Sequence, residues 1–572
     1  MESWNVFTRT SRIAYFSMEI GLAQDIPTYS GGLGVLAGDT IKSAADLNVP
    51  LVAITLASRK GYFAQSLDEE GVQHEAPVEG DISARMKPLP VRITVPIEGR
   101  AVSVAAWLYR NQSPAGGEVP VLFLDTALEE NTEEDQTITD RLYGGEQRYR
   151  LKQEVVLGIG GVRILQALGF RIFQYHMNEG HAALLTIELL NQTRNVHAGS
   201  WMNTLDVDRK AVGKRCVFTT HTPVSAGHDR FEYTLVQEVL GDEVVPMEQL
   251  RQLGGDAELN MTTLALQLSR FVNGVAKKHG EVSREMFPGY EIHAITNGIH
   301  PLTWASAYMV SLFNRHISGW ALQPELLVRV DNISDEEVWE AHQGAKAYLA
   351  QYIKEVTGQQ LFLDVFTIGF ARRVAAYKRN DLIFHDLERL LALGRGRLQL
   401  VFAGKAHPHD NDGKSLIQNI YTAAERLHGE ITVIYLPNYS IDVAKHLIPG
   451  VDVWLNTPTR PLEASGTSGM KAALNGVPNF SVLDGWWIEG HIENITGWSI
   501  GEETSPDTSP EESNAADAED MYKKLEDKIL PLYYEDRAGW VRVMKNAIGK
   551  NAYYFNTHVM MRRYVTEAYL QR

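Results

Sequence analysis

The chain has 572 residues, of which 44% are hydrophobic and 22% are charged, close to the values of ordinary globular proteins. It has no run of the ~20 apolar residues that a membrane helix requires, and its single cysteine, Cys216, excludes an internal disulfide and a thiolate metal cluster. The net charge of -17 would repel a phosphate backbone and no basic stripe offsets it, which argues against a nucleic-acid partner.

The first residues contain an acidic side chain, Glu2, and lack the basic and apolar segments of a secretory signal. We therefore expect a cytoplasmic protein without membrane attachment. The length alone predicts roughly two to four domains.

Short apolar runs rich in β-branched residues alternate with longer helical patterns, which is typical of parallel α/β layers. A first series lies at residues 13–16, 51–56, 121–124, 216–220 and 292–296, and a second at 365–370, 398–403, 431–436, 451–456 and 478–483. The regular spacing of the second series indicates a second doubly wound sheet. The sequence thus predicts an α/β protein with two doubly wound, Rossmann-like domains.

A cluster of turn-forming residues at 297–301 predicts the boundary between these domains. The first domain is expected over residues 1–300, the second over 301–545, and closing helices over 546–572. Residues 501–519 are acidic and poor in apolar side chains. They predict a solvated loop, with an interaction segment as the alternative.

A glycine-rich turn occupies residues 29–38 (YSGGLGVLAG), between the first predicted strand and a helical pattern. Glycines at a helix start let backbone N–H groups approach an oxyanion closely, so phosphate or a sugar phosphate is the natural ligand. A tight strand-to-helix turn without a ligand is the alternative interpretation.

A basic segment, residues 372–379 (RRVAAYKR), follows the predicted strand 365–370 at its carboxyl end. Doubly wound sheets place their ligands at this edge, and guanidinium and ammonium groups bind phosphate through charge-assisted hydrogen bonds. The segment predicts a site for a dianion, whereas a solvated basic surface is the alternative.

A third segment, residues 463–476 (EASGTSGMKAALNG), carries one lysine, Lys471, among glycines and hydroxyl side chains. The hydroxyls and amides could hold a phosphate, and a lysine in a crowded apolar setting is a candidate for Schiff-base chemistry. A purely structural lysine remains open from these residues alone.

These three segments, in this order, resemble the α-glucan phosphorylase family, the enzymes of glycogen, starch and maltodextrin breakdown. Five further segments carry the same resemblance: 219–223 (TTHTP), 273–276 (NGVA), 295–299 (ITNGI), 404–407 (GKAH) and 438–439 (NY). The resemblance spans residues 12 to 490 and is greatest to a compact, short-chain branch. It implies the GT-B type of glycosyltransferase fold, with two Rossmann-like domains facing across a cleft.

The resemblance also implies a cofactor, pyridoxal 5'-phosphate, attached to Lys471. In the family the phosphate of this cofactor, not its aldehyde, takes part in the reaction by relaying a proton. Thr467 and Ser468 would bind that phosphate, Tyr439 and Gly34 would complete the cofactor site, and Lys378 would lie between the cofactor and substrate phosphates.

The implied substrates are an α-glucan or maltodextrin and orthophosphate, and the implied product is α-glucose 1-phosphate with retained configuration. Lys378, Arg373 and His221 would be the catalytic residues, with Arg373 and the amide of Gly34 holding the substrate phosphate. The remaining substrate contacts would be Gly32, Asn273, Glu463, Ala464, Ser465 and Gly466. Members of the family are commonly dimers, so analogy suggests a homodimer.

The chain departs from the pattern of longer members at Ala375, Ala376 and Gly469, and it has two tryptophans, Trp486 and Trp487, where those members are not aromatic. The tryptophans are either a platform for sugar stacking or buried aromatics at a domain interface.

Two further runs contain histidines, residues 176–181 and 407–412. We predict no metal site in residues 407–412 (HPHDND), while Glu179 and His181 are candidate sugar contacts.

Two other functions remain as alternatives. A nucleotide-sugar-dependent glucan synthase would share the architecture, but such enzymes lack the Lys471 motif. A catalytically silent glucan-binding protein would not need Lys471, Arg373 and Lys378 together.

Overall fold

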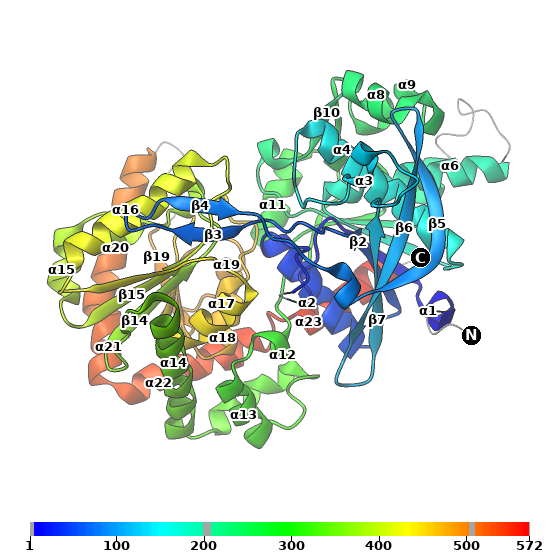
Figure 1. Ribbon diagram of the computed structural model, residues 1–572. Helices are drawn as coiled ribbons and strands as arrows, with labels where there is room; N and C mark the ends of the chain where they lie inside the picture. The colour runs from blue at the N-terminus through cyan, green and yellow to red at the C-terminus, as the bar shows by residue number, and fades with distance from the viewer. Residues whose placement is uncertain (1–4, 24, 198–207, 503–508, 571–572) are drawn as a thin grey trace. The chain divides into compact units, whose positions relative to one another are not determined.

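The computed structural model describes residues 5–23, 25–197, 208–502 and 509–570 (Figure 1). The chain forms two compact units. Unit 1 consists of Met1–Tyr62, Pro77–Thr296 and Met560–Arg572, and unit 2 of Phe63–Ala76 and Asn297–Val559. The chain passes from unit 1 to unit 2 between Thr296 and Asn297, residues 63–76 belong to unit 2, and the last helix ends in unit 1.

The sheet of unit 1 has the order β13-β12-β9-β8-β1-β2-β7-β6-β5. Its strands are β1 (Ile13–Ser17), β2 (Leu51–Leu56), β5 (Lys87–Ile97), β6 (Arg100–Gln112), β7 (Glu118–Asp125), β8 (Gln174–Asn178), β9 (Cys216–Thr219), β12 (Phe271–Gly274) and β13 (His293–Ala294). The strands from β13 to β7 are parallel, whereas β6 pairs antiparallel with both β7 and β5. The long strands β5 and β6 curve along the outer edge of this sheet (Figure 1).

Both faces of the central parallel strands of this sheet are buried, whereas β5 and β6 alternate between buried and more exposed residues. Successive residues of β1 alternate between two hydrophobic cores, with Ala14 and Phe16 in one and Ile13 and Tyr15 in the other. A strand that is buried on both sides must be apolar throughout, which explains the continuous apolar runs of the sequence. The covering helices are α1 (Asn5–Thr10), α2 (Gly32–Asp46), α3 (Glu133–Gln136), α4 (Gln147–Val155), α5 (Gly161–Ala167), α6 (Leu185–His197), α8 (Tyr233–Val244), α9 (Met247–Gly254), α10 (Met261–Gln267) and α11 (Lys277–Met286), and β10 (Arg230–Glu232) pairs with β11 (Glu258–Asn260).

The sheet of unit 2 is entirely parallel, with the order β16-β15-β14-β17-β18-β19. Its strands are β14 (Phe366–Ala371), β15 (Leu398–Ala403), β16 (Thr432–Leu436), β17 (Val453–Asn456), β18 (Asn479–Val482) and β19 (Gly497–Ile500). Its helices are α12 (Pro301–Trp304), α13 (Ala307–His316), α14 (Asp335–Thr357), α15 (Leu387–Gly394), α16 (Asn411–Leu427), α17 (Ile441–Leu447), α18 (Ser468–Leu474), α19 (Trp487–Gly490), α20 (Pro510–Lys524), α21 (Leu530–Glu535) and α22 (Arg537–Asn546), followed by α23 (Thr557–Arg563), which ends in unit 1. The mixed α/β architecture with parallel sheets confirms the predicted fold class at this level.

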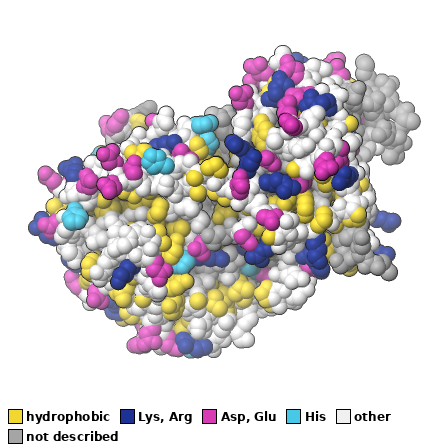
Figure 2. Space-filling model, in the orientation of Figure 1, with side chains coloured by type: hydrophobic (Ala, Val, Ile, Leu, Met, Phe, Trp, Pro, Cys, Tyr) yellow, Lys and Arg dark blue, Asp and Glu magenta, His cyan; other side chains and the backbone are white. Residues whose placement is uncertain are grey.

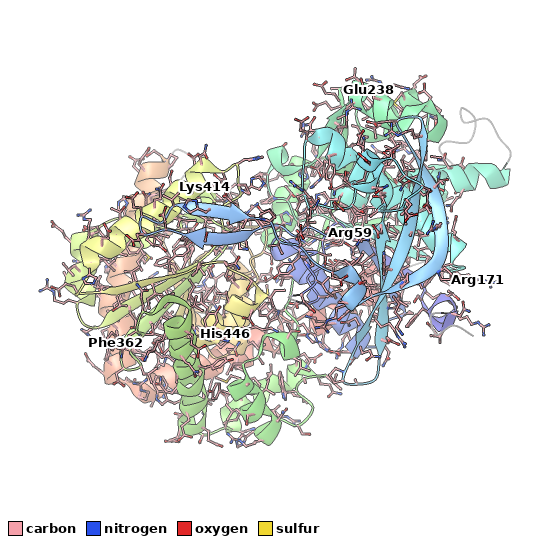
Figure 3. The ribbon with its side chains drawn as sticks, viewed as in Figure 1. Arg59, Arg171, Glu238, Phe362, Lys414 and His446 are labelled. Carbon is pink, nitrogen blue, oxygen red and sulfur yellow. The ribbon has the colours of Figure 1, made fainter. Side chains whose placement is uncertain are left out.

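A hairpin from the N-terminal part of the chain, β3 (Ala64–Leu67) and β4 (Gln73–Ala76), is part of unit 2. The amide of Gln65 donates to the carbonyl of Gly404 at 2.9 Å, and that of Gln73 to the carbonyl of Ala406 at 2.9 Å. Lys414 of α16 forms an ion pair with Glu75 at 2.7 Å, on the side of α16 that faces the hairpin (Figure 3). These bonds explain why a segment so early in the chain joins unit 2.

The prediction of a loop over residues 501–519 is wrong for its second part. Helix α20 begins at Pro510, and Ser509 and Glu512 form a capping box at its start. A serine cap, a proline in the first turn and a glutamate three residues after the cap favour a helix, and this local signal outweighs the acidic composition. Residues 503–508 lie outside the described residues.

The core of unit 2 contains a buried ion pair between α14 and the start of β17. The Nζ of Lys346 donates to Asp452 Oδ2 at 2.6 Å and to the carbonyl of Val365 at 2.7 Å, and His342 bonds the other carboxylate oxygen at 2.8 Å. Both charged side chains are fully buried. The pair therefore fixes α14 against the sheet.

Replacing Lys346 with methionine should lower the free energy of unfolding of unit 2 by about 3 to 5 kcal/mol, because it leaves Asp452 buried without its cation. Urea unfolding followed by fluorescence measures this loss. The exposed Lys354→Met on the same helix is the control and should change stability by less than about 0.5 kcal/mol. An equal effect of both variants would contradict the proposed cause.

Acidic and basic side chains are intermingled on the face shown in Figure 2. Among the described residues, no helix is long and apolar enough to cross a membrane.

Candidate active site

Two loops of unit 2 bring a carboxylate and two cations together at the carboxyl ends of neighbouring strands. Arg372 and Lys378 follow β14, and Glu463 follows β17, its partner in the sheet. Arg372 Nη2 lies 2.5 Å from Glu463 Oε2, and Lys378 Nζ donates to the same oxygen. Burial alone would raise the pKa of Glu463, but the two cations lower it to about 2. Glu463 is therefore ionised, and it orients both cations.

The other side of the Glu463 loop is held by the turn after β18. The backbone N–H of Glu463 donates to Asp484 Oδ2 at 2.9 Å, and that of Gly485 to Asp484 Oδ1 at 2.8 Å. The N–H of Trp486 donates to the carbonyl of Ser465 at 2.9 Å. A Cβ at Gly485 would lie 2.3 Å from that carbonyl oxygen, so only glycine fits where the two loops touch.

Burial raises the pKa of Asp484 from 3.8 to about 6. Between these two values the folded state binds more protons than the unfolded state, so this group stabilises the fold at low pH and the contribution is lost as pH rises from about 4 to about 6.

Asp484→Asn removes this titration. From pH 4 to pH 7 the wild type should therefore lose roughly 2 to 3 kcal/mol of unfolding free energy relative to the variant. Urea unfolding of both proteins at several pH values measures it. A difference that is constant over this range would contradict the assignment.

Lys471 lies at the centre of α18, among buried residues. Its Nζ is 3.6 Å from the centre of the Trp304 ring, and only 6% of the residue is exposed. The amide of Asn475 donates to the carbonyls of Lys471 and Trp304 at 2.8 and 2.9 Å, which fixes α18 against α12. The amine is thus held at one position against an aromatic face.

Five more predicted residues lie in the loop between Glu463 and the helix of Lys471 or at the start of that helix. Thr467 immediately precedes α18, and the Oγ of Ser468 accepts a hydrogen bond from Trp454 Nε1 at 3.1 Å. Gly466 has φ +77°, and the carbonyl of its neighbour Ser465 binds the Asp484 turn. The loop that also contains Ala464 therefore connects Glu463 directly to the helix of Lys471.

Two further predicted residues of unit 2 are more accessible. Arg373 is exposed, in contrast to its neighbour Arg372, and Tyr439 is half-buried after β16. The preceding Asn438 donates its backbone N–H to Gln65 Oε1 at 2.8 Å. The loop that carries Tyr439 is thus held by the β3–β4 hairpin.

Trp486 and Trp487 are 3% and 1% exposed, so the structure favours buried aromatics over a sugar-stacking platform. They pack within unit 2, where Trp486 meets Phe555 edge to face at 4.9 Å. A Cβ at Gly469 would lie 2.9 Å from the Trp486 ring and 2.2 Å from Asn479 Oδ1. Residue 469 is therefore a glycine because a side chain there would collide with Trp486 and Asn479.

In unit 1 the glycine turn is anchored by a carboxylate. Glu19 Oε2 accepts from the N–H of Ser30 at 2.6 Å and of Gly31 at 3.3 Å, and Tyr143 donates to Oε1 at 3.0 Å. A Cβ at Gly34 would lie 2.7 Å from Glu19 Oε2, so a side chain there would displace this anchor. Helix α2 begins at Gly32, and its first amides have no acceptor within the helix.

The histidine of the TTHTP segment is held by the loop after β8. His221 Nε2 bonds Asn178 Oδ1 at 2.7 Å, and its backbone N–H donates to Glu179 Oε2 at 2.7 Å. Burial lowers the pKa of His221 to about 3, so the ring is neutral. The candidate sugar contact Glu179 thus orients His221, while the other candidate, His181, lies 3.3 Å from Asp229.

Asn273 is completely buried, and its side-chain amide forms hydrogen bonds with residues of unit 1. Its Oδ1 accepts from Thr219 at 2.9 Å, and its Nδ2 donates to the carbonyl of Gly274 and to Tyr564 at 3.0 and 3.1 Å. This geometry gives no support to a direct sugar contact.

Four residues that support the site were not predicted from the sequence: Asp484, Asn475, Trp304 and Glu19. Asp484 and Trp304 contact Glu463 and Lys471 from other parts of the chain, Glu19 lies 11 residues before the Ser30 that it binds, and Asn475 lies within the 463–476 segment but its role depends on its bond to Trp304. Among the described residues, no group of three His, Cys, Asp or Glu side chains could hold a metal ion.

Comparison with known proteins identifies the family. A family model described as carbohydrate phosphorylase matches residues 242–497. Maltodextrin phosphorylase of Thermococcus litoralis is 40% identical, over 97% of this chain and 70% of that protein. Glycogen phosphorylase of Mycobacterium tuberculosis is 37% identical, over 94% of this chain and 68% of that protein, and glycogen phosphorylase of Aquifex aeolicus is 34% identical, over 97% and 86%. With similarity of this extent, the chain belongs to the carbohydrate phosphorylase family.

Proposed function

We propose that this protein is an α-glucan phosphorylase. It transfers the terminal α-1,4-linked glucosyl unit of a glucan to orthophosphate, reversibly, and yields α-glucose 1-phosphate with retained configuration. The observation that carries the proposal is that Arg372 and Lys378, which follow β14, bind Glu463, which follows β17. The loop that begins at Glu463 leads to Lys471.

The residues around Lys471 fit pyridoxal phosphate. The donor set combines a buried primary amine over an aromatic ring with hydroxyls at Thr467 and Ser468, and the same loop begins at Glu463, which binds two cations. Two buried polar atoms, Nη1 of Arg372, which binds Glu463, and Oγ of Ser465 in the loop that leads to Lys471, have no hydrogen-bond partner among the described residues. When bound, the cofactor supplies a phosphate that relays a proton to the substrate phosphate.

In this proposal Lys471 holds the cofactor, Thr467 and Ser468 hold its phosphate, and Tyr439 and Gly34 complete its site. An ammonium has three N–H donors, and the bond from Lys378 to Glu463 uses one of them. Lys378 then stabilises two phosphates in contact, each a charge-assisted interaction in a partly dry site. Arg373 and the amide of Gly34 position the substrate phosphate.

The sugar is proposed to lie against the loop of Glu463, Ala464, Ser465 and Gly466, with Gly32 nearby and the backbone carbonyl of His221 facing the positive charge that develops at its reacting carbon. Substrate phosphate protonates the leaving glycosidic oxygen and attacks the same face, so no carboxylate nucleophile is required. We infer the GT-B arrangement, with the two units facing across a cleft, from the family resemblance.

The decisive experiment measures glucose 1-phosphate released from maltodextrin, glycogen and starch in the presence of phosphate. The expected result is release that depends on phosphate. Glucan synthesis from a nucleotide-glucose donor, without phosphorolysis, would instead support the synthase alternative, and glucan binding without either reaction would support the silent binding protein.

A further inference from the structure

Helix α20 places a buried carboxylate between two arginines of unit 2. Asp517 Oδ2 lies 2.7 Å from Arg379 Nη2, and Asp517 Oδ1 lies 2.7 Å from Arg460 Nη2. Asp517 is 1% exposed and its partner Arg379 is buried as well, whereas Arg460 is half-buried. A Cβ at Gly501 would lie 1.8 Å from Asp517 Oδ1, which shows how closely the chain surrounds this carboxylate.

The two arginines belong to the two loops that carry the proposed active-site residues. Arg379 directly follows Lys378, and Arg460 lies three residues before Glu463. Arg379 has φ +48°, an unfavourable conformation for a residue with a side chain. Its guanidinium supports this conformation by donating to the carbonyls of Thr457 and Pro458 at 2.8 and 3.0 Å and to Asn514 of α20 at 2.8 Å.

The loops are also bonded directly to each other. The backbone N–H of Thr459 donates to the carbonyl of Tyr377 at 2.7 Å, and the hydroxyl of Thr457 donates to the carbonyls of Lys378 and Arg379 at 3.1 and 2.9 Å. Asp517 therefore binds two loops that are also bonded to each other, and these loops carry Lys378 and Glu463.

We propose that Asp517 is a positioning residue, which joins the Arg379 and Arg460 loops so that Lys378 and Glu463 meet in the reactive geometry. This inference rests on the proposed function, because it assigns the geometry to phosphorolysis. The proposal also gives a role to the acidic segment 501–519. Its helical part supplies Asp517, which holds the two active-site loops together.

The test compares Asp517→Asn with wild-type enzyme. Because a displacement of about 1 Å can cost about 100-fold in rate, kcat for phosphorolysis should fall about 100-fold while KM for the glucan stays unchanged. Hydrogen exchange at the amides of Lys378 and Thr459 should become faster. Asp517→Glu, which keeps the charge, should recover part of the loss in kcat.

Two control variants separate positioning from general damage. Glu519→Gln changes an exposed carboxylate of the same helix and should leave kcat unchanged. Asp452→Asn breaks a buried ion pair elsewhere in unit 2 and should lower stability without lowering kcat at a temperature where the variant is folded. If Asp517→Asn does not fold, Arg460→Gln removes one arm of the bridge and should lower kcat to a smaller extent.

Wild-type kcat in Asp517→Asn, unchanged amide exchange, or an equal fall of kcat in Asp452→Asn would each overturn the proposal. Failure of the proposed function has a different signature, since wild-type protein would then release no glucose 1-phosphate while the exchange measurement would still report whether Asp517 holds the two loops.

Discussion

Replacing Lys378 with methionine should lower kcat for phosphorolysis by about 1000-fold, because it removes a preorganised cation from a site where two phosphates meet. Methionine keeps most of the apolar stem, so the buried side chain can still pack. Glu463 retains its bond to Arg372 at 2.5 Å, which limits the damage to the loop. The expected fall in kcat is therefore due to the loss of the ammonium group.

Initial rates of glucose 1-phosphate release, with phosphate and maltodextrin varied separately, measure this effect. The matched control is Lys414→Met, which removes the ammonium of another ion pair of unit 2, to Glu75, and should leave kcat unchanged. A kcat close to the wild-type value in Lys378→Met would contradict the role of Lys378 between the phosphates.

Ten of the strands were predictable from the sequence, because a strand that is buried on both sides appears as a continuous apolar run. All ten predicted runs overlap observed strands, since a parallel strand with both faces covered must be apolar along its length. Other strands were not predicted, and β8 is one of them because its central residue is polar. His176 is buried there only because Tyr569 and Thr219 bond its two ring nitrogens, at 2.7 and 2.8 Å, and Tyr569 is 393 residues away in the chain.

The site was predictable as far as the order of its loops. Segments that follow strands of one parallel sheet meet at one edge, so the proximity of Arg372, Lys378 and Glu463 follows from the strand assignment. The residues that hold these loops in place were not predictable, because no local sequence pattern indicates that a carboxylate will bind a group distant in the chain. Asp484 and Asp517 each look like ordinary acidic residues until the fold brings them to Glu463 and Arg379.

Helix α20 shows how a correct composition argument can fail. Acidic, apolar-poor segments usually cannot bury enough surface to become ordered. Here burial is concentrated in few residues, Asp517, Ala518, Met521 and Tyr522, and the carboxylate among them is satisfied by two arginines. Average composition does not contain this information.

Replacing Lys471 with alanine should abolish both the covalent attachment of pyridoxal phosphate and phosphorolysis. Borohydride reduction of wild-type protein, followed by peptide mass mapping, should place the phosphopyridoxyl group on the peptide of α18 that contains Lys471. Lys545→Ala, which removes another buried lysine of unit 2, should keep the label at Lys471. Labelling of a different lysine in fully active protein would contradict the assignment. Because Lys471 is held over Trp304 in a helix that Asn475 fixes to α12, its amine has one direction of approach, and a label elsewhere would mean that this geometry does not form the cofactor site.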